Sequence, residues 1–438
     1  MPVKYTLAQI TQFLDGIPSS LGVVGQRLLR QMLFGLLVSK SVLISEITAG
    51  LGREDQRPGA PTSGSTTGWG GTISLRPRWP RPLHNCSLIR DDHVICLDGS
   101  DIAKPFSKKL EALAKIRDGS KKEIVPGYLL MGAVAVRPGG YDKNPLPLLL
   151  RPYSSAEEHF VSDPYELHMA IEDLHQRTGG RGIFAIDRGA DSGRIFKKLL
   201  GLSHRFVLRL KAGKGCRHLL WKGSELLVRE LVERTQYVGH ADLVRIADGK
   251  RQPYHCDFGS FRVQFQGLEK DGRPLWLCVY NSTAHKQPMV LLTTEPADTE
   301  DQILFVLQCY LARWSVEEFF RFVKQGFALE KVRCFKWWRS KNLIHLVFIA
   351  TCLLSSLHQL TTRMGGRLRT WLIREAKLVH KRRVKSPMLL FNFYAYSSGL
   401  ASILRDRRPA LRLAGWFHKT KRLLPIPSSR QLSFKIMG

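Results

Sequence analysis

Hydrophobic positions along the chain follow different periods in successive regions. Between residues 6 and 50, apolar side chains recur with a helical period in LAQITQFL, QRLLRQMLFGLLV and LISEITAGL, which predicts a small helical bundle. We therefore assign residues 1–53 to a helical N-terminal region, for which DNA binding and a purely packing role are equally open. The next segment, 54–87, loses all periodicity and is dominated by Gly, Pro, Ser, Thr and Arg as far as residue 85. That composition predicts a linker.

From Asp92 onward, short apolar runs alternate with helical patterns. Strands are expected at HVICLD (93–98), YLLMGAVAVR (128–137), LPLLLRPY (146–153), GIFAIDR (182–188) and RFVLRLK (205–211). Helices are expected at 163–177, with Asp163 as the N-cap, and at 191–201. Strands that alternate with helices predict an α/β fold.

The segment 215–295 contains strand-like runs and turn residues, including FRVQFQG, LWLCVYN and MVLLTT, and predicts an inserted β-rich subdomain. Helical patterns return at about 299–325 and 342–360. The expected organisation beyond the linker is listed in chain order: a first core part at 88–214, the β-rich insertion at 215–295, a second core part at 296–360 and a basic C-terminal region at 361–438.

The stretch YLARWSVEEFFRFVK, residues 310–324, is expected to form a single amphipathic helix. At about 100° per residue, Tyr310, Arg313, Glu317 and Lys324 share a sector of roughly 60°, opposite a phenylalanine-rich face. The helix would bury one face and present a carboxylate flanked by cations on the other. A solvated surface with an Arg313–Glu317 ion pair, worth about 0.3 kcal/mol, is the alternative for this stretch taken alone.

Two aspartates, Asp98 and Asp187, each follow a buried apolar run. Sites in open α/β sheets are built at the carboxyl ends of strands, and a carboxylate beside apolar residues is costly unless it binds a cation. With Glu317 as a third oxygen donor, these residues suit hard divalent cations. The alternative for each aspartate is a turn or N-cap role, for which Asp101 and Asp191 are the better candidates.

The charge balance favours a polyanionic partner, either nucleic acid or an acidic membrane surface. The chain has 67 Lys+Arg and 37 Asp+Glu, a net charge of +30, and residues 361–438 alone hold 18 basic and two acidic residues interleaved with aromatics. That mixture favours a folded nucleic-acid or dimerisation surface. The apolar run 343–357 is interrupted by His345 and predicts a buried helix, and no N-terminal signal pattern is present, so we expect a cytoplasmic protein that does not enter a membrane.

The eight cysteines are scattered without a C-x-x-C pair, and the histidines show no paired metal spacing. This usage predicts reduced, buried thiols rather than disulfides or a zinc site.

Tyr310, Arg313, Glu317 and Lys324 match Y-x2-R-x3-E-x6-K, and on this motif the chain resembles the DDE transposases of bacterial insertion sequences, in particular the insertion-sequence-four group. Asp98 in LDGSDIAKP resembles the first catalytic aspartate of that family. Asp187 in AIDRGAD resembles the second, and the long interval before Glu317 leaves room for a β-strand insertion.

The resemblance implies an RNase H-like catalytic core in which Asp98, Asp187 and Glu317 hold two Mg²⁺ ions, for which Mn²⁺ would substitute. It further implies a homodimer that pairs two transposon ends, cleaves them and joins them to target DNA, in a bacterial cytoplasm and at the nucleoid when bound. Tyr310, Arg313, Lys324 and Arg188 would then contact DNA near the cleaved end.

Residues 54–85 depart from the structured basic segment that such transposases tend to have at this point. Our hypothesis is that a frame disruption produced this stretch, which would impair the recognition of transposon ends while leaving the three carboxylates intact.

Three other functions remain open at this stage. An RNase H-like nuclease or resolvase would cut DNA without joining it to a target. A repressor derived from a transposase, or an inactive copy, would bind DNA without cleavage. A basic peripheral membrane protein is the weakest candidate, because no long Lys/Arg-rich amphipathic helix stands out.

Overall fold

The structure is a computed structural model that describes residues 2–17, 21–51, 84–139, 145–247, 250–265, 274–283, 287–379 and 391–406. Nearly all of the expected linker, 54–87, and much of the basic C-terminal region therefore lie outside the described residues. The frame-disruption hypothesis for 54–85 falls there and stays a hypothesis.

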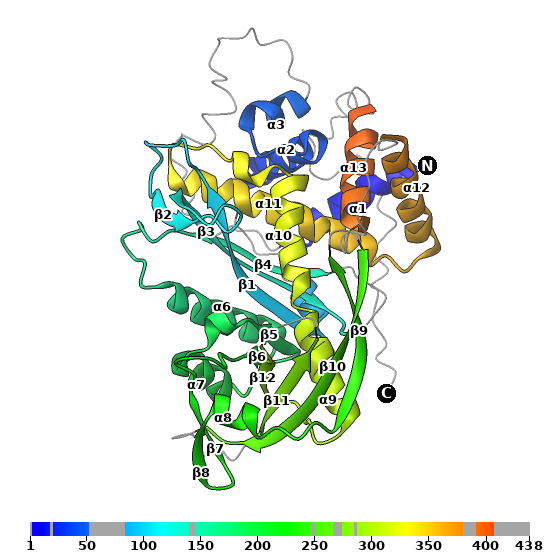
Figure 1. Cartoon of the computed structure of the whole chain (residues 1–438). Helices are drawn as coiled ribbons and strands as arrows, with labels where there is room; N and C mark the ends of the chain where they lie inside the picture. Colours follow the sequence, from blue (N-terminus) through cyan, green and yellow to red (C-terminus); the bar gives the residue numbers. More distant parts are fainter. Residues whose placement is uncertain are drawn as a thin grey trace.

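A large mixed sheet runs through the described part of the molecule (Figure 1). Its strands follow the order β2-β3-β1-β5-β6-β12-β11-β10-β9, and β4 pairs with β3. The bounds are β1 Val94–Ala103, β2 Ala114–Arg117, β3 Ile124–Val136, β4 Leu146–Tyr153, β5 Ile183–Ile186, β6 Arg205–Arg209, β9 Gly239–Ala247, β10 Lys250–Val263, β11 Leu275–Ser282 and β12 Met289–Thr293. The strands β1, β5 and β6 are parallel, whereas β3 is antiparallel to β1. The five strands expected between 93 and 211 are all present.

The β-rich segment does not form a sheet of its own. β12 pairs with β6, and β11, β10 and β9 follow, so these four strands lengthen the central sheet. Among the described residues of this segment, the short hairpin of β7 His218–Trp221 and β8 Ser224–Leu227 pairs separately. The separate subdomain suggested by the sequence is thus replaced by continuous pairing, because the exposed edge of β6 offers its backbone groups to β12.

Helices cover both faces of the sheet (Figure 1). Their bounds are α1 Pro2–Asp15, α2 Val23–Ser39, α3 Ile44–Gly50, α5 His84–Ser87, α6 Asp163–Thr178, η1 Arg188–Ala190, α7 Gly193–Gly201, α8 Val228–Glu233, α9 Glu300–Leu311, α10 Trp314–Gly326, η3 Leu329–Lys331, α11 Trp337–His358, α12 Arg363–Val379 and α13 Phe391–Asp406. One hydrophobic core lies between the sheet and the helices α9, α10 and α11, and the other lies under α6 and α7.

The N-terminal helices pack on the helices at the other end of the chain. Side chains of α1, α2 and α3 share a core with α11, α12 and α13, and the Lys40 ammonium donates to the Ser398 hydroxyl at 2.9 Å. The Val42 backbone N–H also donates to the carbonyl of Phe327, the residue that follows α10, at 3.1 Å. Packing is therefore a role that these helices have in the structure, and DNA binding stays a prediction.

Helix α11 is long and apolar enough to cross a membrane by length and composition, but 83% of its apolar window is buried within the protein. This bears out the expected buried helix. All eight cysteines are free and buried, as their scattered positions predicted.

Candidate active site

Asp98 and Asp187 lie next to each other in the sheet register. The parallel pairing of β1 with β5 runs from Val94–Ile183 to Leu97–Ile186, so the two aspartates are the next residues on neighbouring strands. The sequence suggested that Asp98 ends its strand, but in the structure it does not. β1 continues to Ala103 because it still pairs with β3 after β5 has ended, and Asp98 stands opposite Gly132 there.

Both aspartates belong to the same face of the sheet. Val94 and Cys96 face the core under α9 and α10, whereas Ile95 and Leu97 face the opposite core. Because side chains alternate along a strand, Asp98 continues the series of Val94 and Cys96. The same alternation in β5 assigns Asp187 to that face, so both carboxylates lie on the side of the sheet that α9 and α10 cover.

The stretch 310–324 is not one continuous helix, which corrects the sequence-based prediction. Tyr310 lies at the end of α9, Glu317 and Lys324 lie on α10, and Arg313 lies in the break between them. At the break, the backbone N–H of Arg313 donates to the Tyr310 carbonyl at 3.0 Å and that of Val316 donates to the Arg313 carbonyl at 3.1 Å. These i to i+3 bonds tighten the chain between the two helices.

The phenylalanine-rich face of α10 is nevertheless buried, as the sequence predicted. Phe319, Phe322 and Val323 are fully buried, and Phe320 is nearly so. Packing of these side chains on the sheet fixes the helix that carries Glu317.

Arg313 connects two of the three carboxylates. Its Nη1 atom donates to Asp98 Oδ2 at 2.6 Å and its Nη2 atom lies 2.9 Å from Glu317 Oε1. The predicted Arg313–Glu317 pair exists, but Arg313 is only 9% exposed, so the pair is not a solvated surface contact. Burial opposes the charge of Arg313, yet the carboxylate of Asp98, with smaller contributions from Tyr310, Asp187 and Glu317, raises its pKa.

Tyr310 holds the third carboxylate. Its hydroxyl donates to Asp187 Oδ1 at 2.8 Å, and the ring is 6% exposed. Burial, followed by the nearby Asp187 charge, raises the pKa of Tyr310, so the phenol stays protonated and keeps donating.

The three carboxylates differ in how their surroundings treat a negative charge. Burial raises the pKa of Asp98, and the Asp187 charge adds to this against the opposing Arg313 guanidinium. Burial likewise raises the pKa of Glu317, with Asp98 and Asp187 adding to the effect. Asp187 behaves in the opposite way: burial disfavours its charge, but the Tyr310 hydrogen bond, the Arg188 backbone N–H and nearby guanidinium groups together lower its pKa.

The remaining predicted DNA contacts lie at different places. Lys324 is 3.6 Å from an Asp101 oxygen and 3.4 Å from a Glu330 oxygen, whereas Arg188 is exposed in the turn that follows Asp187. Asp101 lies within β1 and therefore caps no helix.

The caps predicted from the sequence belong to neighbouring serines. Ser192 caps α7, while Asp191 binds the Arg217 guanidinium instead. At α6 the cap is Ser162, whose hydroxyl accepts from the Tyr165 backbone N–H, rather than Asp163. Both serines have an extended backbone, and their hydroxyls accept from backbone N–H groups of the first helical turn.

Sequence reasoning missed three residues near the site. Arg209, at the end of β6, lowers the pKa of Asp187, and its place after a predicted strand beside β5 could have marked it. Gly132 stands opposite Asp98 against Phe320, and Arg217 binds Asp191; neither contact leaves a local signal in the sequence.

The donor set fits a hard divalent cation in its chemistry. All three carboxylates supply oxygen atoms. Burial, with a further contribution from the neighbouring negative charges, raises the pKa of Asp98 and of Glu317, which is the electrostatic situation that a cation relieves. In the structure the Arg313 guanidinium provides that positive charge between Asp98 and Glu317. No group of three His, Cys, Asp or Glu side chains in the described ranges is arranged as a ready-made metal site.

Residues 90–353, more than half of the chain, match the family described as the transposase DDE domain. The chain belongs to this family. The matched segment contains Asp98, Asp187 and Glu317 together with Tyr310, Arg313 and Lys324, whereas α1–α3, α12 and α13 lie outside it.

Among solved structures, the chain is similar to a piggyBac transposase synaptic complex with hairpin DNA. The TM-score is 0.42 and the sequence identity 13%, with 98% of this chain and 85% of that chain covered. No curated protein matches the chain.

Proposed function

We propose that this DDE-family protein is a DNA transposase that cleaves transposon ends and joins them to target DNA, and that it belongs to the insertion-sequence-four group. The observation that carries the proposal is the convergence of Asp98, Asp187 and Glu317, from two neighbouring strands and one helix, around Arg313 and Tyr310. Three separated sequence motifs therefore meet at one place on one face of the sheet.

The strand arrangement supports an RNase H-like core. The order β4-β3-β1-β5-β6, with β3 antiparallel to β1 and with β1, β5 and β6 parallel, is the arrangement expected for such a core. It sets the first two carboxylates side by side and leaves the third to a helix laid across them.

Asp98, Asp187 and Glu317 would hold two divalent ions, Mg²⁺ or Mn²⁺. When bound, such ions activate a water or a 3′-hydroxyl and stabilise the leaving oxygen in phosphodiester transfer. Tyr310 keeps the Asp187 carboxylate ionised and oriented through its hydrogen bond. Arg313 balances the charges of Asp98 and Glu317, and its guanidinium is also a group that would suit a DNA phosphate.

Lys324, which pairs with Asp101, and the exposed Arg188 would be further phosphate contacts. Transposon-end and target DNA would be the partners, with two copies of the chain holding a pair of ends in the bacterial cytoplasm.

The test is cleavage of a labelled duplex that carries the element's own terminal repeat, in Mg²⁺ and in EDTA, by the wild type and by Glu317→Gln. We expect metal-dependent 3′-end nicking and strand joining that Glu317→Gln lowers by at least about a thousandfold, with DNA binding retained. The matched control is Glu318→Gln, because Glu318 is the next residue of α10 but pairs with Arg321 away from the site.

Cleavage without joining would instead assign a nuclease or resolvase. Tight binding without cleavage by the wild type would assign a DNA-binding protein derived from a transposase. Equal losses in the two glutamate variants would remove the special role of Glu317.

A further inference from the structure

A cluster of exposed cations lies at one corner of the molecule, away from the residues assigned above. It is formed by the segment between β1 and β3 and by the loop that precedes α11, and we name its exposed members the basic corner. They are Lys108, Lys109, Lys115, Arg117, Lys121, Lys122, Lys331, Arg333 and Lys336, together with Phe106 and Phe335. Within 104–124 and 330–341, which are described throughout, the exposed acidic residues are Glu111, Glu123 and Glu330. The corner therefore carries a clear excess of positive charge.

Backbone and side-chain contacts hold the two segments of the basic corner together. The Glu111 backbone N–H donates to the Phe335 carbonyl at 3.0 Å, and the Trp337 backbone N–H donates to a Glu111 carboxylate oxygen at 2.7 Å. Tyr128 and Trp337 stack beneath them with ring centroids 4.0 Å apart. The cations therefore occupy a shared surface that is fixed by the fold.

The basic corner is continuous with the catalytic carboxylates. Lys104 donates to the Glu330 carbonyl, and Lys324 lies between Asp101 and Glu330. Lys324 stands about two turns beyond Glu317 on α10. The line from the carboxylates to the corner therefore passes Lys324, which neutralises Asp101 and Glu330 on the way.

Two phenylalanines make the corner unlike an ordinary solvated surface. Phe106 is 94% exposed and Phe335 is 64% exposed, each within two residues of a lysine. Aromatic rings set among cations suit nucleic acid, because the cations bind phosphates while the rings contact sugars and bases.

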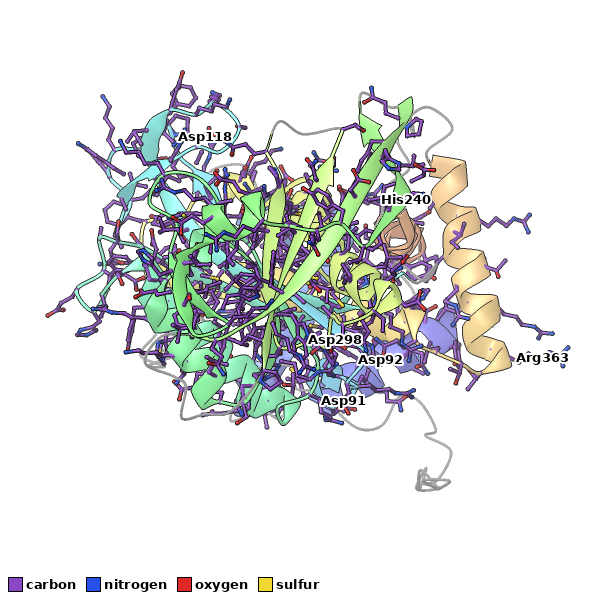
Figure 2. The ribbon with its side chains drawn as sticks, turned by 60° about the horizontal axis from the view of Figure 1, so that its bottom comes forward. Asp91, Asp92, Asp118, His240, Asp298 and Arg363 are labelled. Carbon is purple, nitrogen blue, oxygen red and sulfur yellow. The ribbon has the colours of Figure 1, made fainter. Side chains whose placement is uncertain are left out.

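Protection of a sheet edge explains only part of this arrangement. β2 is the terminal strand of the sheet, its Lys115 and Arg117 point outward, and charged side chains on an edge strand prevent pairing with other chains. Edge protection accounts for neither the exposed phenylalanines nor the cations of the second segment. Figure 2 shows Asp118, in the turn after β2, at an outer corner of the molecule with long side chains reaching outward around it.

We propose that the basic corner binds duplex DNA of any sequence through its phosphates, as the track along which DNA leads to and from the catalytic carboxylates. Phe106 and Phe335 contact the sugars of the same duplex. The inference rests on the proposed function for the assignment of DNA as the partner, and it adds a surface that the three carboxylates do not require.

The test compares two triple variants of the full chain. The first, Arg117→Gln/Lys121→Gln/Lys122→Gln, removes charge from the corner, and the control, Lys197→Gln/Lys222→Gln/Arg229→Gln, removes the same charge from exposed positions on α7, β7–β8 and α8. These elements lie at the opposite end of the molecule from β2 (Figure 1). Both variants are first checked for an unchanged melting temperature.

Binding of a duplex that lacks the terminal repeat is measured in EDTA over a series of salt concentrations. We expect the corner variant to bind this duplex at least about tenfold more weakly than the wild type. The slope of log K against log salt concentration should decrease in magnitude by about 2 to 3, because each phosphate contact contributes about 0.9 to it. The control should lose neither. Phe106→Ala/Phe335→Ala should weaken binding a few-fold with the slope unchanged.

Equal binding by the corner and control variants overturns the proposal. Aggregation of the corner variant with unchanged DNA binding also overturns it, in favour of edge protection. If the corner variant loses affinity for a single-stranded oligonucleotide but not for the duplex, the assignment of duplex DNA is overturned. Because binding is measured in EDTA, each outcome is independent of whether the wild type cleaves the terminal repeat.

Discussion

The guanidinium of Arg313 donates to the carboxylate of Asp98 at 2.6 Å although the two residues are 215 positions apart. The same guanidinium reaches Glu317 at 2.9 Å. A cation built into the chain thus stands between two of the carboxylates that are proposed to hold metal.

Replacing Arg313 by Gln should destabilise the metal-free protein by about 3 kcal/mol, because buried carboxylates lose their partner. The variant should also bind Mn²⁺ more tightly without DNA, because the ion no longer competes with a guanidinium. The expected gain in affinity is roughly tenfold, which corresponds to about 1.4 kcal/mol of binding free energy. The measurement is the rise in melting temperature on adding Mn²⁺.

The control for this prediction is Arg321→Gln, which removes a partly exposed arginine of α10 whose partner is Glu318. Added Mn²⁺ should raise the melting temperature of this control variant by the same amount as that of the wild type. A rise for Arg313→Gln that is no larger than that of the wild type would contradict competition between arginine and metal.

Neutralising Asp98 and Asp187 should change stability in opposite directions. The folded-state pKa of Asp98 is raised by burial, so its charged form at neutral pH weakens the fold and Asp98→Asn should raise the melting temperature. The folded-state pKa of Asp187 is lowered, despite burial, by the Tyr310 hydrogen bond, so Asp187→Asn should lower the melting temperature.

The pH dependence of this pair has a defined sign. A raised carboxyl pKa contributes stability that is complete below the unfolded-state pKa and lost as pH rises through the folded-state value; a lowered pKa contributes stability that is lost as pH falls through the folded-state value. The shift caused by Asp98→Asn should therefore be largest near pH 7 and vanish toward about pH 4, whereas the shift caused by Asp187→Asn should still be present at about pH 4 and be lost only at lower pH. Shifts of the same sign in both variants at pH 7 would refute the assignment.

Gly132 controls how closely the Glu317 helix approaches the sheet. A Cβ atom at this position would lie 2.5 and 2.6 Å from ring atoms of Phe320, which is buried on α10. Gly132→Ala should cost about 1–3 kcal/mol and lower cleavage by displacing α10. Urea unfolding and the nicking assay measure the two effects.

A second change should rescue Gly132→Ala if the clash is the cause. Adding Phe320→Leu removes the ring and should restore part of both stability and cleavage. Gly99→Ala is the control, because its nearest atom, the Leu130 carbonyl oxygen, would be 3.8 Å away. Failure of the double variant to recover either quantity would assign the defect to β3 itself.

Arg217 supports the turn that carries Asp187. Its Nε atom donates to Asp191 at 2.6 Å, and its guanidinium lies over the Phe196 and Phe265 rings at 4.6 and 5.0 Å. The Asp191 side chain is 4% exposed, so Arg217→Gln leaves a buried charge and should cost about 3–5 kcal/mol in urea unfolding.

Two further variants separate charge from geometry at this pair. Arg217→Lys should be intermediate, because lysine keeps the charge but loses the planar fork and the ring stacking. Asp191→Asn combined with Arg217→Gln should recover part of the loss, since the buried charge is gone. Additive losses in the double variant would show that the two residues are not coupled.

Several features could be predicted from the sequence because each depends on local pattern. Short apolar runs predicted the strands that lead to Asp98 and Asp187, and the phenylalanine-rich face of α10 identified its buried side. Scattered cysteines predicted the buried free thiols. These inferences need only the spacing of side chains along a strand or helix.

Other features depended on contacts between distant segments. No local pattern distinguishes strands that extend an existing sheet from strands that form a separate sheet, because the outcome depends on which sheet edge is free. Here the free edge is that of β6, and β12 pairs with it. The break before α10 likewise has no Gly or Pro to mark it.

The sequence by itself determined which side chains the proposed site contains: three carboxylates, a tyrosine and cations, placed by strand and helix periods. The tertiary structure decided how they meet. It directs Arg313 inward to Asp98 and Glu317, ties Tyr310 to Asp187 and gives the three carboxylates unequal affinities for a proton. The physical reason is that hydrogen bonding and the cost of burying charge depend on distances and solvent exclusion, which are set only when segments far apart in the chain pack together.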